Sequence, residues 1–202
     1  DSSAAGSTAV GGNGATHRPV FAPADAMMAE ERGRRLLGPH RLRTQPGSEL
    51  QFFHVPLASC GVFGLEYTGS TEIIPYGPAD HYTITIPLSG AVSSTTGGTK
   101  SASSAGWMAA MQPGPETRLS IAKGTILLGA RIPTSAVERR LGVLTGRPTQ
   151  KSLSLSHIIA PSPAVESVLT MLRQVILTSE KAPTLPAQLA TALEEALLTV
   201  VL

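Results

Sequence analysis

The chain has 202 residues, of which 42% are hydrophobic and 15% are charged, and its formal net charge is +2. A chain of this length buries enough surface to form one well-packed domain with an appendage. The near-neutral charge provides no strong field for a nucleic acid or an anionic membrane, the single cysteine excludes an internal disulfide, and no apolar run is long enough to span a bilayer. We therefore expect a cytoplasmic protein without a membrane partner.

The N-terminal part of the chain divides into two segments of different composition. Residues 1–20 are rich in Gly, Ala and Ser, and they bury too little apolar surface to offset the entropy lost on ordering. This composition predicts a flexible arm. The segment Asp25–Leu37 mixes Met, Ala and Leu with charged side chains and is compatible with a helix, although Gly33 weakens it by about 1 kcal/mol relative to Ala.

Short runs of β-branched and aromatic residues, separated by Gly, Pro and Ser, predict a series of strands in the middle of the chain. The clearest of these runs are Gln51–Val55, Cys60–Tyr67, Thr71–Tyr76, His81–Leu88, Ala91–Thr96, Thr99–Ser104 and Thr125–Ile132. The pair Gly97-Gly98 predicts a tight hairpin between two of them. The total, about eight or nine strands before residue 133, is typical of a barrel or a jelly-roll sandwich.

Helical patterns replace the strand patterns after residue 133. Ser135 and Glu138 have the spacing of a capping box, and Gly146 follows as a stop signal. Two longer helices are predicted to begin at Ser162-Pro163 and after Pro186, each with one apolar stripe, and together they form a helical hairpin. The second stripe still continues at Leu202, so we expect the natural protein to extend further.

Metal-binding and catalytic patterns are absent from the sequence. A cupin metal site uses two histidines one residue apart with a nearby carboxylate, but no two histidines have this spacing among His17, His40, His54, His81 and His157. The sequence contains no Gly-x-Ser-x-Gly nucleophile motif, and Cys60 lies at an apolar strand start where a buried thiol is inert. We therefore predict no catalytic residues, no metal and no cofactor.

The remaining hypothesis from the residues is a ligand pocket, because a small barrel encloses either side chains or one small ligand. Aromatic residues form only 4% of the chain, and Tyr67, Tyr82 and Trp107 are candidates for the pocket wall. Filling of the core is the alternative role for each of them. Arg131 lies in an otherwise apolar run and needs an anionic partner, which is either a ligand carboxylate or a glutamate of the chain.

Four segments together resemble the N-terminal domain of AraC/XylS-type transcription regulators, in its AraC-binding-like version. These segments are Leu37–Leu42, Tyr82–Gly90, Arg131–Pro133 with the helix after it, and Leu193–Leu198. They occur in the order and with spacings compatible with that family, over roughly residues 20–202. The resemblance implies an α+β fold, in which a cupin-like β-barrel (a double-sheet jelly roll) is followed by a C-terminal helical hairpin.

The resemblance also implies a function for each part of the chain. The barrel, over residues 21–160, would bind a small-molecule effector, with Tyr67, Tyr82, Trp107 and Arg131 as its candidate ligand-binding residues. The hairpin, over residues 161–202, would pair two subunits into a homodimer. The candidate interface residues are Leu172, Val175, Leu193 and Leu197, for which packing within one subunit is the alternative.

In regulators of this family, promoter DNA is bound by a helix-turn-helix domain that follows the barrel and hairpin, and this chain ends before such a domain. We therefore expect a non-enzymatic sensing and dimerisation domain. Two alternatives from other functional classes are a stand-alone cupin-type enzyme and an oligomerisation module whose barrel holds no ligand.

Overall fold

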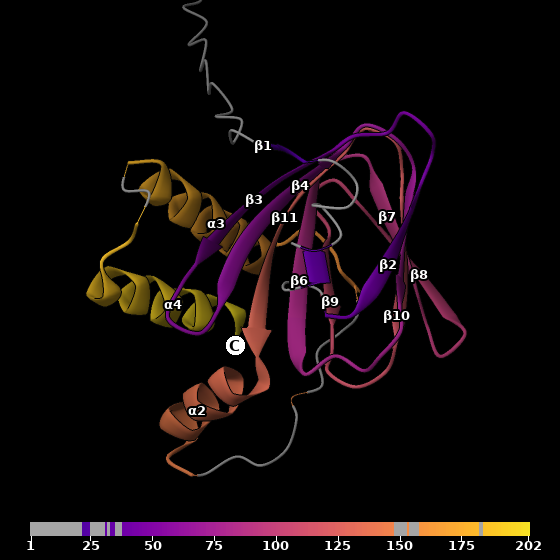
Figure 1. Cartoon of the computed structure of the whole chain (residues 1–202). Helices are drawn as coiled ribbons and strands as arrows, with labels where there is room; N and C mark the ends of the chain where they lie inside the picture. The colour runs from indigo at the N-terminus through magenta and orange to yellow at the C-terminus, as the bar shows by residue number, and fades with distance from the viewer. Residues whose placement is uncertain are drawn as a thin grey trace, which may run out of the picture.

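The computed structural model describes residues 22–24, 31, 33–34, 38–147, 153, 158–181 and 184–202. These residues form two antiparallel sheets that face each other, with helices against the outer side of one sheet (Figure 1). The predicted arm, residues 1–20, lies outside the described residues. So does most of the predicted helix Asp25–Leu37, of which the three described residues, Glu31, Gly33 and Arg34, are helical.

One sheet has seven strands and the other has five. The larger sheet has the spatial order β1 (Ala22–Ala24), β3 (Leu50–Pro56), β4 (Gly61–Tyr67), β11 (Thr125–Pro133), β6 (His81–Ser89), β9 (Met108–Met111) and β12 (Ile158–Ile159). The smaller sheet has the order β2 (His40–Thr44), β5 (Thr71–Pro75), β10 (Thr117–Ile121), β7 (Ala91–Thr96) and β8 (Thr99–Ser104). The chain crosses repeatedly between the two sheets, as in a jelly roll, and the predicted fold class is confirmed.

The seven-stranded sheet is buried on both faces. Its inner face and the five-stranded sheet enclose the space that we call the lumen, while its outer face is covered by α3 (Pro163–Lys181) and α4 (Ala187–Val201) (Figure 1). Side chains of a strand alternate between the two faces. Consequently Tyr82, Ile84 and Ile86 of β6 pack toward the helices, and the residues between them face the lumen.

A helix, α2 (Thr134–Thr145), follows β11 without a loop. The predicted capping box at Ser135 is wrong: Ser135 lies inside the helix, the N-cap is Pro133, and no side chain caps this end. The reason is the direct connection, which places Thr134 in the first turn, where its backbone N–H and its hydroxyl both donate to the carbonyl of Asp80. The predicted stop at Gly146 is confirmed, because this residue caps the helix with φ +66°, a conformation that favours glycine.

Candidate functional site: the polar end of the lumen

The lumen has an apolar part and a polar part. The apolar part is a cluster of Leu50, Phe52, Phe63, Leu65, Tyr67 and Leu127 from the larger sheet with Ile73, Val92, Leu119 and Ile121 from the smaller one. The polar part follows β6, whose lumen-facing side chains His81, Thr83 and Thr85 we call the β6 strip. These three residues are only 2–4% exposed, so most of their surface is covered by protein.

Several hydrogen-bonding atoms of the β6 strip have no partner among the described residues. The Nδ1 atom of His81 lies 2.8 Å from Oδ1 of Asp80 and donates to it. Within the described part of the chain, neither Nε2 of His81 nor the hydroxyls of Thr83 and Thr85 form a hydrogen bond. These three atoms are not fully enclosed by protein and border the lumen cavities, so each is accessible to a small polar molecule there. The strip therefore has unused capacity to bind a polar molecule.

Two small cavities border the strip. His81 and Thr83 line a cavity of about 50 Å³, together with His40, Gln112 and Thr117, and Thr85 lines a second cavity of about 10 Å³. Ligand pockets in proteins usually measure about 300–1,000 Å³. The larger cavity has room for a few water molecules, so a larger ligand would require the side chains at this end of the lumen to move apart.

A charged pair lies at the same end of the barrel. Oδ1 of Asp80 accepts hydrogen bonds from His81 and, at 3.3 Å, from Nη2 of Arg131. The hydrogen bond from His81 is the main cause that lowers the pKa of the Asp80 carboxyl, and the charge of Arg131 contributes. Burial lowers the pKa of His81, and it also lowers the pKa of His54, which lies near the charge of Arg131. At neutral pH the site therefore combines uncharged imidazoles with one ion pair.

Arg131 has the anionic partner that the sequence analysis predicted. The partner within the chain is Asp80 rather than a glutamate, and the side chain of Arg131 remains 26% exposed. Nε of Arg131 is buried and has no hydrogen-bond partner among the described residues. The Nε–H group of Arg131 thus remains an unused buried donor beside the ion pair.

The four predicted ligand-binding residues do not form one site. Tyr67 faces the lumen, but it lies in the apolar part, where burial raises the pKa of its hydroxyl. Register with β4 places Arg131 opposite Gly61 and Thr125 opposite Tyr67. Tyr67 and Arg131 are therefore separated by six residues, or about 20 Å, along the strands.

The other two predicted residues lie outside the lumen. Tyr82 is fully buried between the sheet and the helices, where its hydroxyl donates to the carbonyl of Leu153 at 2.9 Å. Trp107 is 37% exposed in the connection between β8 and β9. The sequence showed the alternation in β6, but we expected the aromatic face to line the pocket. The signal that the other face lines the lumen was its set of hydrogen-bonding side chains, those of His81, Thr83 and Thr85.

Three of the four predicted interface residues are buried inside this chain. Leu172, Val175 and Leu197 are 0% exposed and pack in the core between the helices and the sheet, against which Leu193 is half-buried. Four apolar side chains that α4 leaves exposed, those of Leu189, Ala192, Ala196 and Val200, lie on another face of the helix. We call these four residues the α4 stripe.

Metal ligands and membrane spans can be assessed over the described part of the chain. Its His, Cys, Asp and Glu residues include no group of three or more that could hold a metal ion. None of the described helices has the length and apolar character needed to cross a membrane.

Comparison with known proteins identifies the family. The profile of the AraC-binding-like domain matches residues 29–202. The chain belongs to this family. The resemblance found in the sequence is thereby confirmed, since the match covers both the barrel and the C-terminal helices.

One solved structure shares the fold over most of this chain. The AraC-like transcriptional activator CuxR is similar with a TM-score of 0.63 and 10% sequence identity, over 90% of this chain and 68% of that one, a likeness that shows the fold. Weaker matches include the cupin domain of Schizosaccharomyces pombe Cnp3 (TM-score 0.38, 16% identity, 50% of this chain and 74% of that one). An RmlC-like cupin from Shewanella frigidimarina is another (TM-score 0.37, 15% identity, 44% and 78%). A search of curated proteins found no match.

Proposed function

We propose that this AraC-binding-like domain is the effector-sensing and dimerisation part of an AraC-type transcription regulator. A small molecule would bind at the polar end of the lumen, two subunits would pair through α4, and a separate helix-turn-helix domain of the whole regulator would contact promoter DNA. Family membership supports the regulatory role. The observation that carries the ligand site is the β6 strip, whose hydrogen-bonding atoms border the lumen cavities and lack protein partners among the described residues.

The chemistry of the strip favours an uncharged ligand rich in hydrogen-bonding groups. Nε2 of a neutral His81 accepts a hydrogen bond, and the hydroxyls of Thr83 and Thr85 both donate and accept. Arg131 and Asp80 already neutralise each other at this end. A charged ligand would lose its hydration there without gaining a full countercharge, whereas hydroxyl or amide groups would replace water at little cost.

Calorimetry tests this site. A panel of uncharged polyols, sugars and amides, with carboxylic acids and amines of similar size, is first screened by thermal shift. We expect an uncharged compound to bind, and the double variant Thr83→Val/Thr85→Val to weaken its affinity about 5- to 100-fold through the loss of two hydrogen bonds. Thr95→Val, on the outer face of the five-stranded sheet, is the matched control and should leave the affinity unchanged. Equal affinities for the double variant and the control would exclude the strip as the site.

The small volume of the cavity favours one alternative function. With about 50 Å³ available, the barrel would serve only as the rigid core of an oligomerisation module, filled by side chains and water. In that case no compound of the panel would change the melting temperature, while the protein would still form dimers.

The α4 stripe supports the proposed dimer. Its members recur at intervals of three or four residues and so lie along one side of the helix. The two alanines near its centre allow the backbone of a second helix to approach closely. A second copy of this chain, presenting the same stripe, would cover it in an isologous interface.

A further inference from the structure

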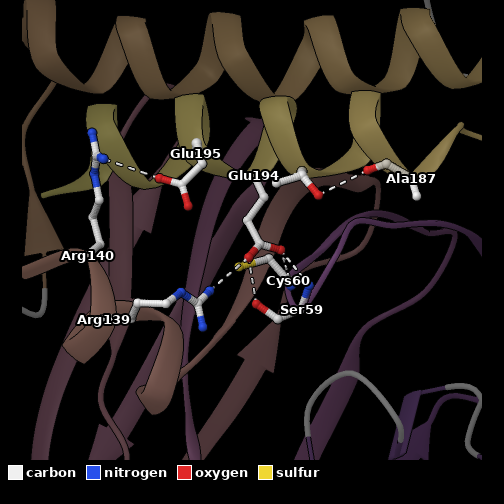
Figure 2. A network of polar contacts seen from close by, with 8 residues as sticks. Ser59, Cys60, Arg139, Arg140, Ala187, Glu194 and Glu195 are labelled. Atoms are coloured by element: carbon white, nitrogen blue, oxygen red, sulfur yellow. Dashed lines mark hydrogen bonds and ion pairs between the residues drawn. The ribbon is translucent and has the colours of Figure 1, made fainter. Parts of the chain in front are cut away.

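The buried face of α4 carries one carboxylate, that of Glu194, between the apolar residues Ala190 and Leu197. Glu194 is 2% exposed and lies over the turn between β3 and β4 (Figure 2). It accepts hydrogen bonds from the backbone N–H of Ser59, from the Ser59 hydroxyl at 2.6 Å and from the backbone N–H of Cys60 at 2.8 Å. Nη2 of Arg139, on α2, lies 3.3 Å from Oε1 of the same carboxylate. One buried carboxylate thus joins three separate elements.

The next residue of α2 makes a parallel set of contacts. Nη1 of Arg140 lies 3.2 Å from Oε2 of Glu195, and Nη2 donates to the hydroxyl of Thr199 at 2.7 Å (Figure 2 shows the Arg140–Glu195 pair). Two consecutive arginines of α2 therefore hold more than one turn of α4. The stripe proposed to contact a second copy lies on the outer side of that same helix.

The N-terminal end of α2 contacts the candidate effector site. The hydroxyl of Thr134 donates to the carbonyl oxygen of Asp80 at 2.7 Å, and the backbone N–H of Thr134 lies 3.5 Å from the same oxygen. The carboxylate of Asp80 holds His81 and Arg131. From Thr134 to Arg140 the helix rises about 9 Å, and its internal hydrogen bonds make a segment of this length move as a unit.

We propose that α2 is a rigid coupling element that links the polar end of the lumen, through Asp80 and Thr134, to the position of α4, through Arg139, Arg140 and Glu194. The two ends of this link rest on the proposed function, one as the effector site and the other as the dimer helix. A ligand that engages His81 would displace Asp80, and α2 would transmit the displacement to α4. The size of the response is limited by the difference in the ligand's affinity for the two positions.

Cys60 can report on the contact between α4 and the turn that precedes β4. Cys60 is the single cysteine, it is 5% exposed, and it lies in the turn that Glu194 holds. Burial, followed by the charge of Glu194, raises the pKa of its thiol to about 12. The thiol therefore reacts with a disulfide reagent only when the contact between α4 and the turn opens.

The experiment measures the rate at which Cys60 of the full chain reacts with a soluble aromatic disulfide. We expect Glu194→Gln to raise the rate about tenfold, because it weakens the contact and removes the charge that raises the pKa of the Cys60 thiol. Thr134→Val, at the N-terminal end of α2, should raise it at least threefold, and Thr134→Ser, which keeps the hydroxyl, should retain the original rate. In the double variant Thr134→Val/Glu194→Gln the two effects should fall clearly short of multiplying, because both act on one contact.

Two controls make the result decisive. Thr145→Val is the same substitution at the other end of α2, where the hydroxyl bonds only to nearby carbonyls, and it should leave the rate within twofold. Ile121→Val, in the lumen core, reports the effect of lowered global stability alone. The proposal is overturned if Thr134→Val behaves like either control at matched stability, or if its effect multiplies independently with that of Glu194→Gln. The assay uses no ligand and no partner, so this failure is distinguishable from a failure of the effector site.

Discussion

The carboxylate of Glu194, near the end of the chain, accepts a hydrogen bond of 2.8 Å from the backbone N–H of Cys60, in the turn that leads into β4. This bond attaches α4 to the barrel from the buried face of the helix, whose other members are the apolar residues Ala190, Leu197 and Leu198. Together with the contacts of Ser59 it satisfies the acceptor atoms of the buried carboxylate, and Arg139 supplies the opposite charge. The C-terminal helix is therefore an integral part of the barrel domain.

Replacing Glu194 with Ala should destabilise the domain by about 2–3 kcal/mol. The substitution leaves the backbone N–H groups of Ser59 and Cys60 without their acceptor, and unpaired buried donors carry a cost of this order. Urea denaturation measures the change. Glu166→Ala removes a carboxylate of α3 that pairs with Arg173 at the surface, and it should change stability by less than about 0.5 kcal/mol. Equal effects of the two substitutions would contradict the role assigned to Glu194.

Stability should fall in two steps as the pH is lowered. Burial lowers the pKa of His81 and of His54 below the ordinary value of 6.5, so the unfolded chain takes up protons there before the folded protein does. Stability is then greater above about pH 6.5 and decreases below it. His81→Gln should reduce this first decrease, measured as the urea midpoint at about pH 7.5 and 5.5. An unchanged decrease in this variant would argue against a neutral His81.

The second step depends on Glu194. Burial alone would raise the pKa of its carboxyl, but the hydrogen bonds from Ser59 and Cys60 and the charge of Arg139 outweigh it and lower the pKa below 4.5. A lowered carboxyl pKa contributes stability above about pH 4.5 that is lost as the pH falls further. Glu194→Gln should therefore show a shallower loss of stability below about pH 4.5 than the original protein. The same slope in both proteins would contradict the direction of this pKa shift.

Two glycine-to-alanine substitutions should have opposite effects. A Cβ at Gly129 on β11 would lie 2.5 Å from the backbone carbonyl of Ile84 and from the ring of Phe63, and overpacking of this kind costs about 1–3 kcal/mol. A Cβ at Gly142, within α2, meets only Arg147 at an ordinary distance of 3.5 Å. Gly142→Ala should stabilise the domain by about 0.5–1 kcal/mol through the higher helix propensity of Ala. Thermal melting of the two variants measures both changes in stability. A Gly129→Ala variant as stable as the original protein would contradict the predicted overpacking and show that β6 can move away from β11.

Ala196→Glu should convert the proposed dimer into a monomer. The substitution places a charge in the middle of the α4 stripe, where a second copy would have to desolvate it. Thr170→Glu, at an exposed position of α3, is the control and should leave the dimer intact. Sedimentation or light scattering gives the mass. A monomeric original protein, or a dimeric Ala196→Glu variant, would exclude the stripe as the interface.

The regular strands and helices were largely predictable because their patterns are local. The hairpin of Ala91–Thr96 and Thr99–Ser104 has the predicted bounds, and both Gly97 and Gly98 adopt the positive φ that a tight turn requires. The strands His40–Thr44, Met108–Met111 and Thr117–Ile121 were missed. Their polar, small or Met-rich composition lacks the β-branched and aromatic enrichment on which strand prediction depends.

The sequence by itself determined the element types, the two amphipathic helices and the family, since each of these follows from local spacing or from the order of motifs. Only the tertiary structure decided which face of each strand lines the lumen and which face of each helix packs against the sheet. The alternation in β6 separates Tyr82 from His81 and Thr83, but both faces of its sheet are buried, so hydrophobicity does not distinguish the lumen side from the helix side. For the same reason the structure moved the candidate effector site to the polar face of β6 and the candidate dimer surface to the outer face of α4. Long-range contacts, such as that of Glu194 with Cys60, leave no local signal in the chain.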